Sequence, residues 1–374
     1  MSASESIAPP DWASVRAEFP ALAYRTFLNT ATFGQLPRRA TEAVARHFEH
    51  RDELACADFL DWFDDVDAIR DSIAKLIHCS RDDIAFVPNA ATGLSLLMSG
   101  IDWKPGDQVV TLENEFPNNL YWPSLLKSQG VEFLEVPWSR LYESLTEDTR
   151  LVAVSTVNYS TGFRVPVEEL GRVLRDRGIV YYLDGTQSLG ALQFDVAAVQ
   201  PDMLAAHGYK WLLSPNGAGF MYVRPSLREQ LKPNVIGWRS HKDWRRVDSL
   251  HHGAPEFVNT AEKYEGGMLN FASLYAMGAS LEMMLELGMD RIEARVLDLA
   301  RQCAHLLESA GGQIEHRGSG IVTARFPDRD ASALARSLEE NRILVSARHG
   351  RLRVSAHFYN NEDDLGRLRE ALFE

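Results

Sequence analysis

The chain has 374 residues, 45% of them hydrophobic and 24% charged, which is typical of a globular protein with a substantial core. Its 39 basic and 52 acidic residues give a formal net charge of −13, which works against general affinity for nucleic acid or anionic lipid. No apolar run approaches the roughly 20 residues of a membrane span, and the polar first ten residues do not resemble a signal peptide. We therefore expect a cytoplasmic protein that binds neither nucleic acid nor a membrane.

Cysteine and histidine spacing gives no sign of a disulfide framework or a metal site. Cys56, Cys79 and Cys303 are widely spaced and form no CxxC pair. Three histidines between positions 241 and 252 lack a carboxylate or cysteine at ligand spacing. We expect no metal ion.

In the first two thirds of the chain, short apolar runs alternate with helical patterns. Apolar residues keep a 3,4 spacing from Trp62 to Leu76, and the segment from Pro166 to Gly178 has an acidic first turn and a basic last turn. This order predicts an α/β fold, with a mainly parallel central sheet covered by helices on both faces. The predicted strands are 84–87, 108–112, 131–136, 151–157, 179–183, 203–206 and 219–223.

Beyond about residue 255 the pattern changes to that of a smaller α+β domain. Long helices are predicted at 272–287 and 292–307, short strands at 321–326, 344–347 and 352–355, and a last helix at 363–372. We assign 25–260 to a large domain, and 1–24 with 261–374 to a small one. The segment 232–262 lacks clear periodicity, and we expect it to line a site or a subunit interface.

Two side chains of complementary chemistry follow neighbouring predicted strands. Asp184 ends one apolar run, and Lys210 follows the next together with His207 and Tyr209. Ligands of open α/β sheets bind at the carboxyl ends of the strands. A carboxylate can keep a pyridine nitrogen protonated and a lysine can form an imine with an aldehyde, and pyridoxal 5′-phosphate needs both. Capping of the next short helix is the alternative for Asp184.

Three further strand ends carry candidate cofactor contacts, each with a structural alternative. Ala91 and Thr92 open a helix whose N-terminus would seat a phosphate, although Asn89 or Thr92 could simply cap that helix. Phe116 could lie on an aromatic cofactor or belong to the core. Asn158 could reach a ring hydroxyl or merely form a turn.

The spacing of these residues resembles a known family. The run Asp184-Gly-Thr-Gln187 is followed by Lys210 within His-Gly-Tyr-Lys-Trp. This block resembles the class V aminotransferases of the fold-type I pyridoxal-phosphate enzymes, a family that also includes cysteine desulfurases, kynureninase and isopenicillin-N-epimerase-like proteins. The resemblance extends from 27–34 to 352–360.

The resemblance implies a role for each matching position. Lys210 would form the Schiff base with the cofactor and then move the Cα proton, while Asp184 would pair with the pyridinium nitrogen and Gln187 with the phenolic oxygen. Phe116 would stack on the ring. The phosphate cup would be formed by Ala91, Thr92, His207 and Tyr209.

The substrate side and the subunit interface are implied in the same way. Arg353 matches the arginine that grips the substrate carboxylate, and Asn158 and Thr30 are the other substrate-binding candidates. The family is homodimeric, with active sites at the subunit interface, and one segment reaches the partner's phosphate. That segment usually ends in Gly-Thr, but here it ends in Gly267-Met268, so only a backbone N–H contact would survive.

The expected function is a pyridoxal-phosphate enzyme acting at the α-carbon of a small amino acid, with amino transfer as the first choice. The segment 346–350 has no cysteine where desulfurases carry one, which disfavours a persulfide mechanism. A cysteine-independent C–S or C–C lyase and an epimerase are the alternatives. A binding or regulatory module that retains the fold is the non-enzyme alternative, and the intact site argues against it. Candidates for recognising a distal substrate group are Arg164, Arg348, His349 and the loop around Trp238.

Overall fold

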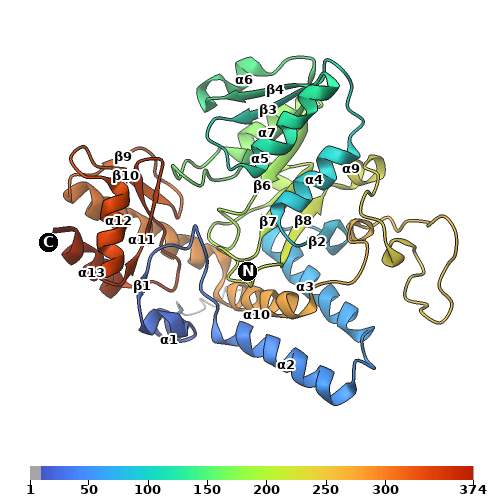
Figure 1. Ribbon diagram of the computed structural model, residues 1–374, viewed down its shortest axis with the longest axis horizontal. Helices are drawn as coiled ribbons and strands as arrows, with labels where there is room; N and C mark the ends of the chain where they lie inside the picture. The colour runs from blue at the N-terminus through green and yellow to red at the C-terminus, as the bar shows by residue number, and fades with distance from the viewer. Residues whose placement is uncertain (1–9, 374) are drawn as a thin grey trace, which may run out of the picture.

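A seven-stranded mixed sheet lies at the centre of the computed structural model, which describes residues 10–373 (Figure 1). Neighbouring strands from β7 through β4 are parallel, and only β8 runs antiparallel to its two neighbours. In spatial order the strands are β2 (Ile84–Val87), β8 (Gly219–Val223), β7 (Met203–His207), β6 (Val180–Asp184), β5 (Thr149–Ser155), β3 (Gln108–Leu112) and β4 (Glu132–Val136). The predicted mainly parallel sheet is therefore confirmed.

The reversed direction of β8 follows from its connection to β7. A parallel neighbour needs a crossover of a dozen or more residues, usually through a helix. The segment 208–218 contains no helix and turns back directly, so β8 pairs with β7 in antiparallel register, from Met203 opposite Val223 to His207 opposite Gly219.

Alternate residues of the central strands belong to two separate cores, one on each face of the sheet. Val109 and Ala153 lie in one core, with residues of α4 (Ala90–Gly100) and α9 (Pro225–Gln230). Val110 and Val154 lie in the other, with residues of α3 (Asp61–Ile77), α7 (Val167–Asp176) and α10 (Phe271–Leu287). Both faces are covered, as the continuous apolar runs of the sequence predict.

The remaining helices of this part lie around the sheet or beneath it in Figure 1. The helix α10 packs against both α2 and α3. Their bounds are α1 (Trp12–Ala17), α2 (Arg38–Leu54), α3 (Asp61–Ile77), α5 (Asn118–Leu125), α6 (Leu141–Ser144), α7 (Val167–Asp176), α8 (Val196–Val199) and α10 (Phe271–Leu287).

A smaller α+β unit follows α10, at the left of Figure 1. Its antiparallel sheet has the order β12-β13-β10-β9, and its own apolar core lies between the sheet and three helices. The elements are α11 (Met289–Ser309), β9 (Gln313–Ile314), β10 (Val322–Arg325), α12 (Ala331–Glu340), β11 (Ile343–Leu344), β12 (Ser346–Arg348), β13 (Arg351–Val354) and α13 (Glu362–Phe373).

The N-terminal segment is tied to this smaller unit. The short strand β1 (Thr26–Phe27) pairs in parallel with β11, and Leu28 lies in the core of the small unit. We assign residues from 25 onward to the large domain, yet these first residues pair with the C-terminal part of the chain. The pairing brings the segment 29–34 to the carboxyl edge of the central sheet, against Lys210.

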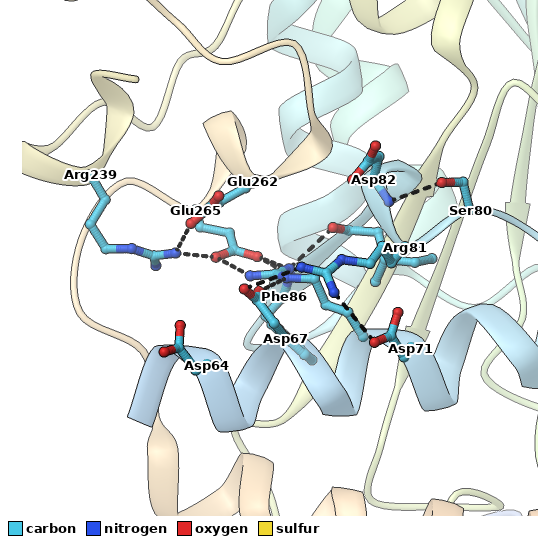
Figure 2. A network of polar contacts seen from close by, with 12 residues as sticks. Asp64, Asp67, Asp71, Ser80, Arg81, Asp82, Phe86, Arg239, Glu262 and Glu265 are labelled. Carbon is cyan, nitrogen blue, oxygen red and sulfur yellow. Dashed lines mark hydrogen bonds and ion pairs between the residues drawn. The ribbon is translucent and has the colours of Figure 1, made fainter. Parts of the chain in front are cut away.

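The segment 232–262 is anchored by buried charges and aromatic rings rather than by regular elements. The Glu265 carboxylate accepts hydrogen bonds from the guanidinium group of Arg70 on α3 (2.5 and 2.9 Å). It also accepts one from Arg239 (3.0 Å), which Figure 2 shows. The Arg239 guanidinium also lies 4.6 Å from the ring centroid of Phe63 and 4.8 Å from that of Trp244. No helix between residues 10 and 373 is long and apolar enough to cross a membrane.

Candidate active site

Lys210 is a buried amine at the carboxyl edge of the sheet. Its side chain follows β7 and is 7% exposed, and it makes no ion pair with any of residues 10–373. The Nζ atom lies 5.5 Å from the centroid of the Phe116 ring and 5.6 Å from that of Tyr209. Burial lowers the pKa of the Lys210 amine to about 8, although the charge of Asp184 opposes this effect. About one tenth of the amine is therefore neutral, and nucleophilic, at pH 7, far more than for an ordinary lysine.

Asp184 ends β6, the strand beside β7. Its Oδ1 accepts a hydrogen bond from the backbone N–H of Thr186 at 2.9 Å, and the residue is 5% exposed. The short helix that follows begins at Val196 and is capped by Asp195, so the capping alternative for Asp184 does not hold. The carboxylate forms no ion pair in the described part of the chain, and its charge acts on Lys210, His207 and Tyr209 alike.

His207 supplies a buried polar atom that lacks a partner. Its Nδ1 is buried without a hydrogen bond among the described residues, and burial lowers the pKa of the imidazole. The neighbouring Tyr209 ring lies 5.0 Å away, and burial raises the pKa of its phenol. A protonated phenol and a neutral imidazole can both donate to a phosphate. An unpartnered buried nitrogen here is what a bound anion would satisfy.

The side-chain amide of Gln187 is oriented by one backbone partner and one side-chain partner. Its Nε2 donates to the carbonyl of Ala31 at 3.1 Å, and its Oε1 accepts from the indole N–H of Trp211 at 2.9 Å. An amide nitrogen has two hydrogens, so the second remains for a ring oxygen. The amide thus joins the N-terminal segment to the residue that follows Lys210.

Phe116 and Glu115 come directly after β3. The Phe116 ring lies edge-on to Tyr159, with centroids 5.2 Å apart. The Glu115 carboxylate is buried and accepts from the backbone N–H (2.7 Å) and hydroxyl (2.5 Å) of Ser155, from the Asn119 amide (3.1 Å) and from the Phe116 N–H (3.3 Å). Burial raises the pKa of Glu115 to about 6. Glu115 therefore fixes the backbone of the ring expected to stack on the cofactor.

The start of α4 has the geometry of a helix cap. The side chain of Asn89 accepts from the Thr92 backbone N–H at 2.9 Å and from the Thr92 hydroxyl at 3.1 Å. The capping alternative thus accounts for Asn89 and for the hydroxyl of Thr92. The first-turn N–H groups at Ala90 and Ala91 remain donors that a helix cannot satisfy internally.

Asn158 is occupied mainly by the turn that follows β5. Its Oδ1 accepts from the Ser160 N–H (2.9 Å), the Ser160 hydroxyl (2.9 Å) and the Thr161 N–H (3.0 Å), and its Nδ2 donates to the Asn114 carbonyl (2.9 Å). These bonds are those expected if Asn158 serves mainly to form the turn. One amide hydrogen remains for a ligand.

Arg353 is a buried cation without a carboxylate. It is 1% exposed and donates to Ser346 Oγ (3.0 Å), to the Tyr159 carbonyl (2.7 Å) and to Thr32 Oγ1 (2.6 Å). Burial and the nearby charge of Arg348 lower the pKa of its guanidinium to about 9, so it keeps its charge at neutral pH. No acidic residue between 10 and 373 pairs with it. A buried charge of this kind calls for an anionic ligand.

The structure places the predicted Thr30 apart from this guanidinium. The Thr30 hydroxyl is buried against the Tyr359 hydroxyl at 2.8 Å, and the threonine that touches Arg353 is Thr32. The sequence reasoning also missed Glu115 and Tyr159. Both stand beside residues it selected, and a glutamate at the end of an apolar strand was a visible signal for Glu115.

Gly267 and Met268 lie away from the Lys210 cluster, on the surface near the anchored segment. The Gly267 carbonyl accepts from Arg239 at 3.0 Å, and Met268 is 57% exposed. Their predicted contact with a partner subunit's phosphate stays a prediction.

Comparison with known proteins gives similarity along almost the full length. A probable cysteine desulfurase of Methanothermobacter thermautotrophicus is 26% identical, covering 96% of this chain and 97% of the relative. Isopenicillin N epimerase of Streptomyces clavuligerus is 28% identical, covering 98% of each. A solved structure of a C-DES mutant with glycine covalently linked to its PLP cofactor has a TM-score of 0.87 at 22% identity, covering 97% of this chain and 99% of the other.

The fold and the buried lysine–aspartate site together define a fold-type I enzyme of the pyridoxal-phosphate class. The family model for aminotransferase class-V matches residues 39–368, and the chain belongs to that family. The predicted cofactor, pyridoxal 5′-phosphate, is confirmed by the family, and the residues fit it. The buried amine, the facing carboxylate and the unpartnered His207 nitrogen are the groups it requires.

Proposed function

We propose that the protein acts at the α-carbon of a small amino acid and that its reaction is amino transfer. The observation that carries the proposal is Lys210, a buried amine with a pKa of about 8 and no ion-pair partner in the described chain. Such an amine is suited to hold an aldehyde cofactor covalently and to exchange a proton with the substrate. When bound, pyridoxal phosphate withdraws electrons from the α-carbon.

The chain's own residues divide the remaining work. Asp184 would keep the cofactor's ring nitrogen protonated by its charge, and Glu115 adds negative charge at the same edge of the sheet. Lys210, when neutral, would be the base that accepts the α-proton at its Nζ atom and later returns it. Arg353 binds the α-carboxylate in two parallel hydrogen bonds, which fixes the position of the α-carbon.

Substitution of Asp184 tests the assignment directly. Asp184→Asn should lower turnover by at least about 100-fold because an electrostatic partner of the reacting system is lost. Asp202→Asn is the matched control, since Asp202 is a buried carboxylate that accepts from the Tyr181 N–H at 2.8 Å and pairs with Arg224 at the opposite end of β6. It should cost stability and leave the turnover of the holoenzyme unchanged. Near-normal activity in Asp184→Asn would overturn the proposal.

We propose amino transfer ahead of the other reactions because the family to which the chain belongs is named for it, aminotransferase class-V. A lyase that uses no cysteine nucleophile is the second candidate, and two observations favour it. A similar solved structure is of a cystine C-S lyase in complex with cysteine persulfide (TM-score 0.86, 22% identity). In the chain itself, burial raises the pKa of Cys79 and Cys303 to about 12, which leaves both thiols protonated and inert.

An amino acid panel separates the reactions. Transfer moves ¹⁵N from the substrate to an added keto acid, whereas elimination releases ammonia without an acceptor. Epimerisation leaves the substrate intact but introduces solvent deuterium at its α-carbon. Transfer of ¹⁵N is the expected result, and ammonia release without transfer would favour the lyase.

The proposal includes a homodimer with active sites at the subunit interface. Val235, Ile236 and Met268 expose apolar side chains in this region, and Val235 lies against Gly266. The Gly267 N–H donates to the Glu265 carbonyl at 2.9 Å, so the Met268 N–H is the donor proposed for the partner's phosphate. Sedimentation of the holoenzyme should give a dimer. A monomer that retains full activity would contradict this part of the proposal.

A further inference from the structure

A two-residue turn carries basic side chains beside the buried Arg353. His349 and Gly350 join β12 to β13, and both have positive φ angles of +48° and +73°. This backbone suits a tight hairpin, but it disfavours a residue with a Cβ at the first position. His349 is therefore held in an unfavourable backbone conformation by its surroundings, and such residues often lie at functional sites.

The tip is fastened to the wall of the site through Tyr159. The Tyr159 hydroxyl and His349 Nε2 are 2.8 Å apart, and the two rings lie edge-on to each other. The same tyrosine packs edge-on against Phe116, and its carbonyl accepts from Arg353. One residue thus connects the hairpin, the ring expected to stack on the cofactor, and the carboxylate-binding arginine.

Arg348 immediately precedes this tip and has no acidic partner. It is half-buried, and its guanidinium makes one protein hydrogen bond, to the carbonyl of Ala347 at 2.7 Å. Its charge acts on Lys210, Arg353 and Tyr159, so it lies within electrostatic range of the site. No carboxylate within residues 10–373 pairs with it, although the chain has 52 acidic residues.

Neighbouring arginines of the same sheet, unlike Arg348, do have an acidic partner. Arg351 and Arg325 both bind Glu315, at 2.7 and 2.9 Å. Among the other candidates for a distal group, Arg164 pairs with Glu293 at 3.2 Å, and Trp238 packs on Phe63 of α3. Among residues 10–373, neither the Arg348 nor the Arg353 guanidinium at the site has an acidic partner.

The strand register places these two cations on one face of the hairpin. Ser346 lies opposite Arg353 and contacts it, and Arg348 is two residues further along the same strand. Residues two apart on a strand point to the same face, so Arg348 and Arg353 are diagonal neighbours across the strand pair, roughly 7–8 Å apart. Arg351, directly opposite Arg348, shares this face, but its guanidinium is bound to Glu315. A substrate α-carboxylate at Arg353 would therefore leave a second positive charge a few bonds away.

We propose that the substrate carries a second anionic group and that Arg348 binds it while Arg353 binds the α-carboxylate. The protein is then selective for amino acids with an acidic side chain. This inference rests on the proposed function, because it assumes that the α-carboxylate occupies Arg353. The His349–Tyr159 pair holds Arg348 in position and does not itself bind the substrate.

Unreactive acids test the second anion site in the holoenzyme, with the absorbance of the bound cofactor as the signal. Succinate and glutarate should bind at least about tenfold more tightly than the chain-matched butyrate and valerate, because each gains a charge-assisted contact. The analogues 3-sulfopropionate and 3-phosphonopropionate replace the distal carboxylate by a sulfonate or a phosphonate. The analogue that binds most tightly shows which of the three distal groups the site prefers.

Variants assign the preference to Arg348. Arg348→Gln should abolish it while leaving the affinity for butyrate unchanged, and Arg348→Lys should retain part of it. Arg351→Gln is the matched control, since it removes a guanidinium of the same hairpin that binds Glu315, and it should keep the full preference. Equal binding of monoacids and diacids by the wild type, which needs no variant to fold, would overturn the proposal. So would a preference that survives in Arg348→Gln.

Failure of the proposed function would be visible before any acid is added. In that case borohydride treatment of protein prepared with the cofactor would add no mass at Lys210. A holoenzyme that passes this test but does not distinguish diacids from monoacids contradicts only the second anion site.

Discussion

Gly34 packs directly on the backbone of Lys210. A Cβ built at Gly34 would lie 1.9 Å from the Lys210 carbonyl oxygen, and the Gly34 N–H donates to the adjacent Tyr209 carbonyl at 2.9 Å. The N-terminal segment is therefore a wall of the site and sets the position of the lysine backbone. No side chain fits between the two segments.

Gly34→Ala should destabilise the protein by roughly 2–3 kcal/mol and weaken cofactor binding, since one backbone must move to admit the methyl group. Thermal unfolding of the apoprotein and a cofactor titration measure the two effects. Gly366→Ala is the control, because its Cβ would meet no atom within 4 Å and a helix interior favours alanine. Unchanged stability and affinity in Gly34→Ala would mean that the two segments separate readily.

Features that depend on position along a strand could be predicted from the sequence. The strands 108–112 and 219–223 were predicted with the observed bounds because each is a continuous apolar run between turn residues. Asp184 and Lys210 could be brought together because ligands gather at strand ends.

Contacts between distant segments could not be predicted in that way. Thr32 and Arg353 are 321 positions apart, and Arg70 and Glu265 are 195 apart. Nothing local distinguishes Thr32 from Thr30 in the sequence, because only the packing of the N-terminal segment decides which hydroxyl faces the guanidinium. The direction of β8 likewise depends on a connection that lacks any periodic signal.

Lys210→Met should stabilise the apoprotein in a pH-dependent way. The folded-state pKa of about 8 is below the unfolded value of 10.5, so the folded state disfavours the charged amine. The wild type bears the full penalty below pH 8 and loses it as the pH rises to 10.5. The variant should therefore be more stable by roughly 3 kcal/mol at pH 7, and the difference should vanish near pH 10.5.

Chemical unfolding of both apoproteins across this pH range gives the difference. Lys242→Met is the control, since Lys242 forms an exposed ion pair with Glu256 and its removal should give no comparable gain. A pH-independent difference between Lys210→Met and the wild type would show that packing, not charge, dominates at this position.

Glu115→Gln tests a pH dependence of stability opposite to that at Lys210: burial of Glu115 makes the wild type less stable, not more stable, as the pH rises. Burial raises the folded-state pKa of Glu115 from 4.5 to about 6, so the folded state favours the protonated carboxyl. The wild type has this advantage in full below pH 4.5 and loses roughly 2 kcal/mol of it as the pH rises through 6. The amide variant lacks the titration. The stability difference between the two proteins should therefore change across pH 4.5–6.5 and stay constant above, and a constant difference throughout would contradict the assigned burial cost.

Glu265→Gln should weaken the segment 232–268 as a unit. The Glu265 side chain is fully buried and pairs with both Arg70 and Arg239. It also accepts from the Phe86 N–H at 2.8 Å, and Figure 2 labels Glu265, Arg239 and Phe86. Loss of its charge leaves two buried guanidinium groups with only Asp67 and Glu262 as acidic partners, at a cost of roughly 3 kcal/mol of stability.

Because Arg239 donates to the Gly267 carbonyl, the same change should also weaken cofactor retention if Gly267 serves the partner subunit. Unfolding midpoints and cofactor dissociation rates measure the two effects, with Glu256→Gln on the exposed Lys242 pair as the control that should leave both unchanged. Loss of stability with unaltered cofactor retention would confine Glu265 to a structural role and contradict the placement of Gly267 at the partner's phosphate.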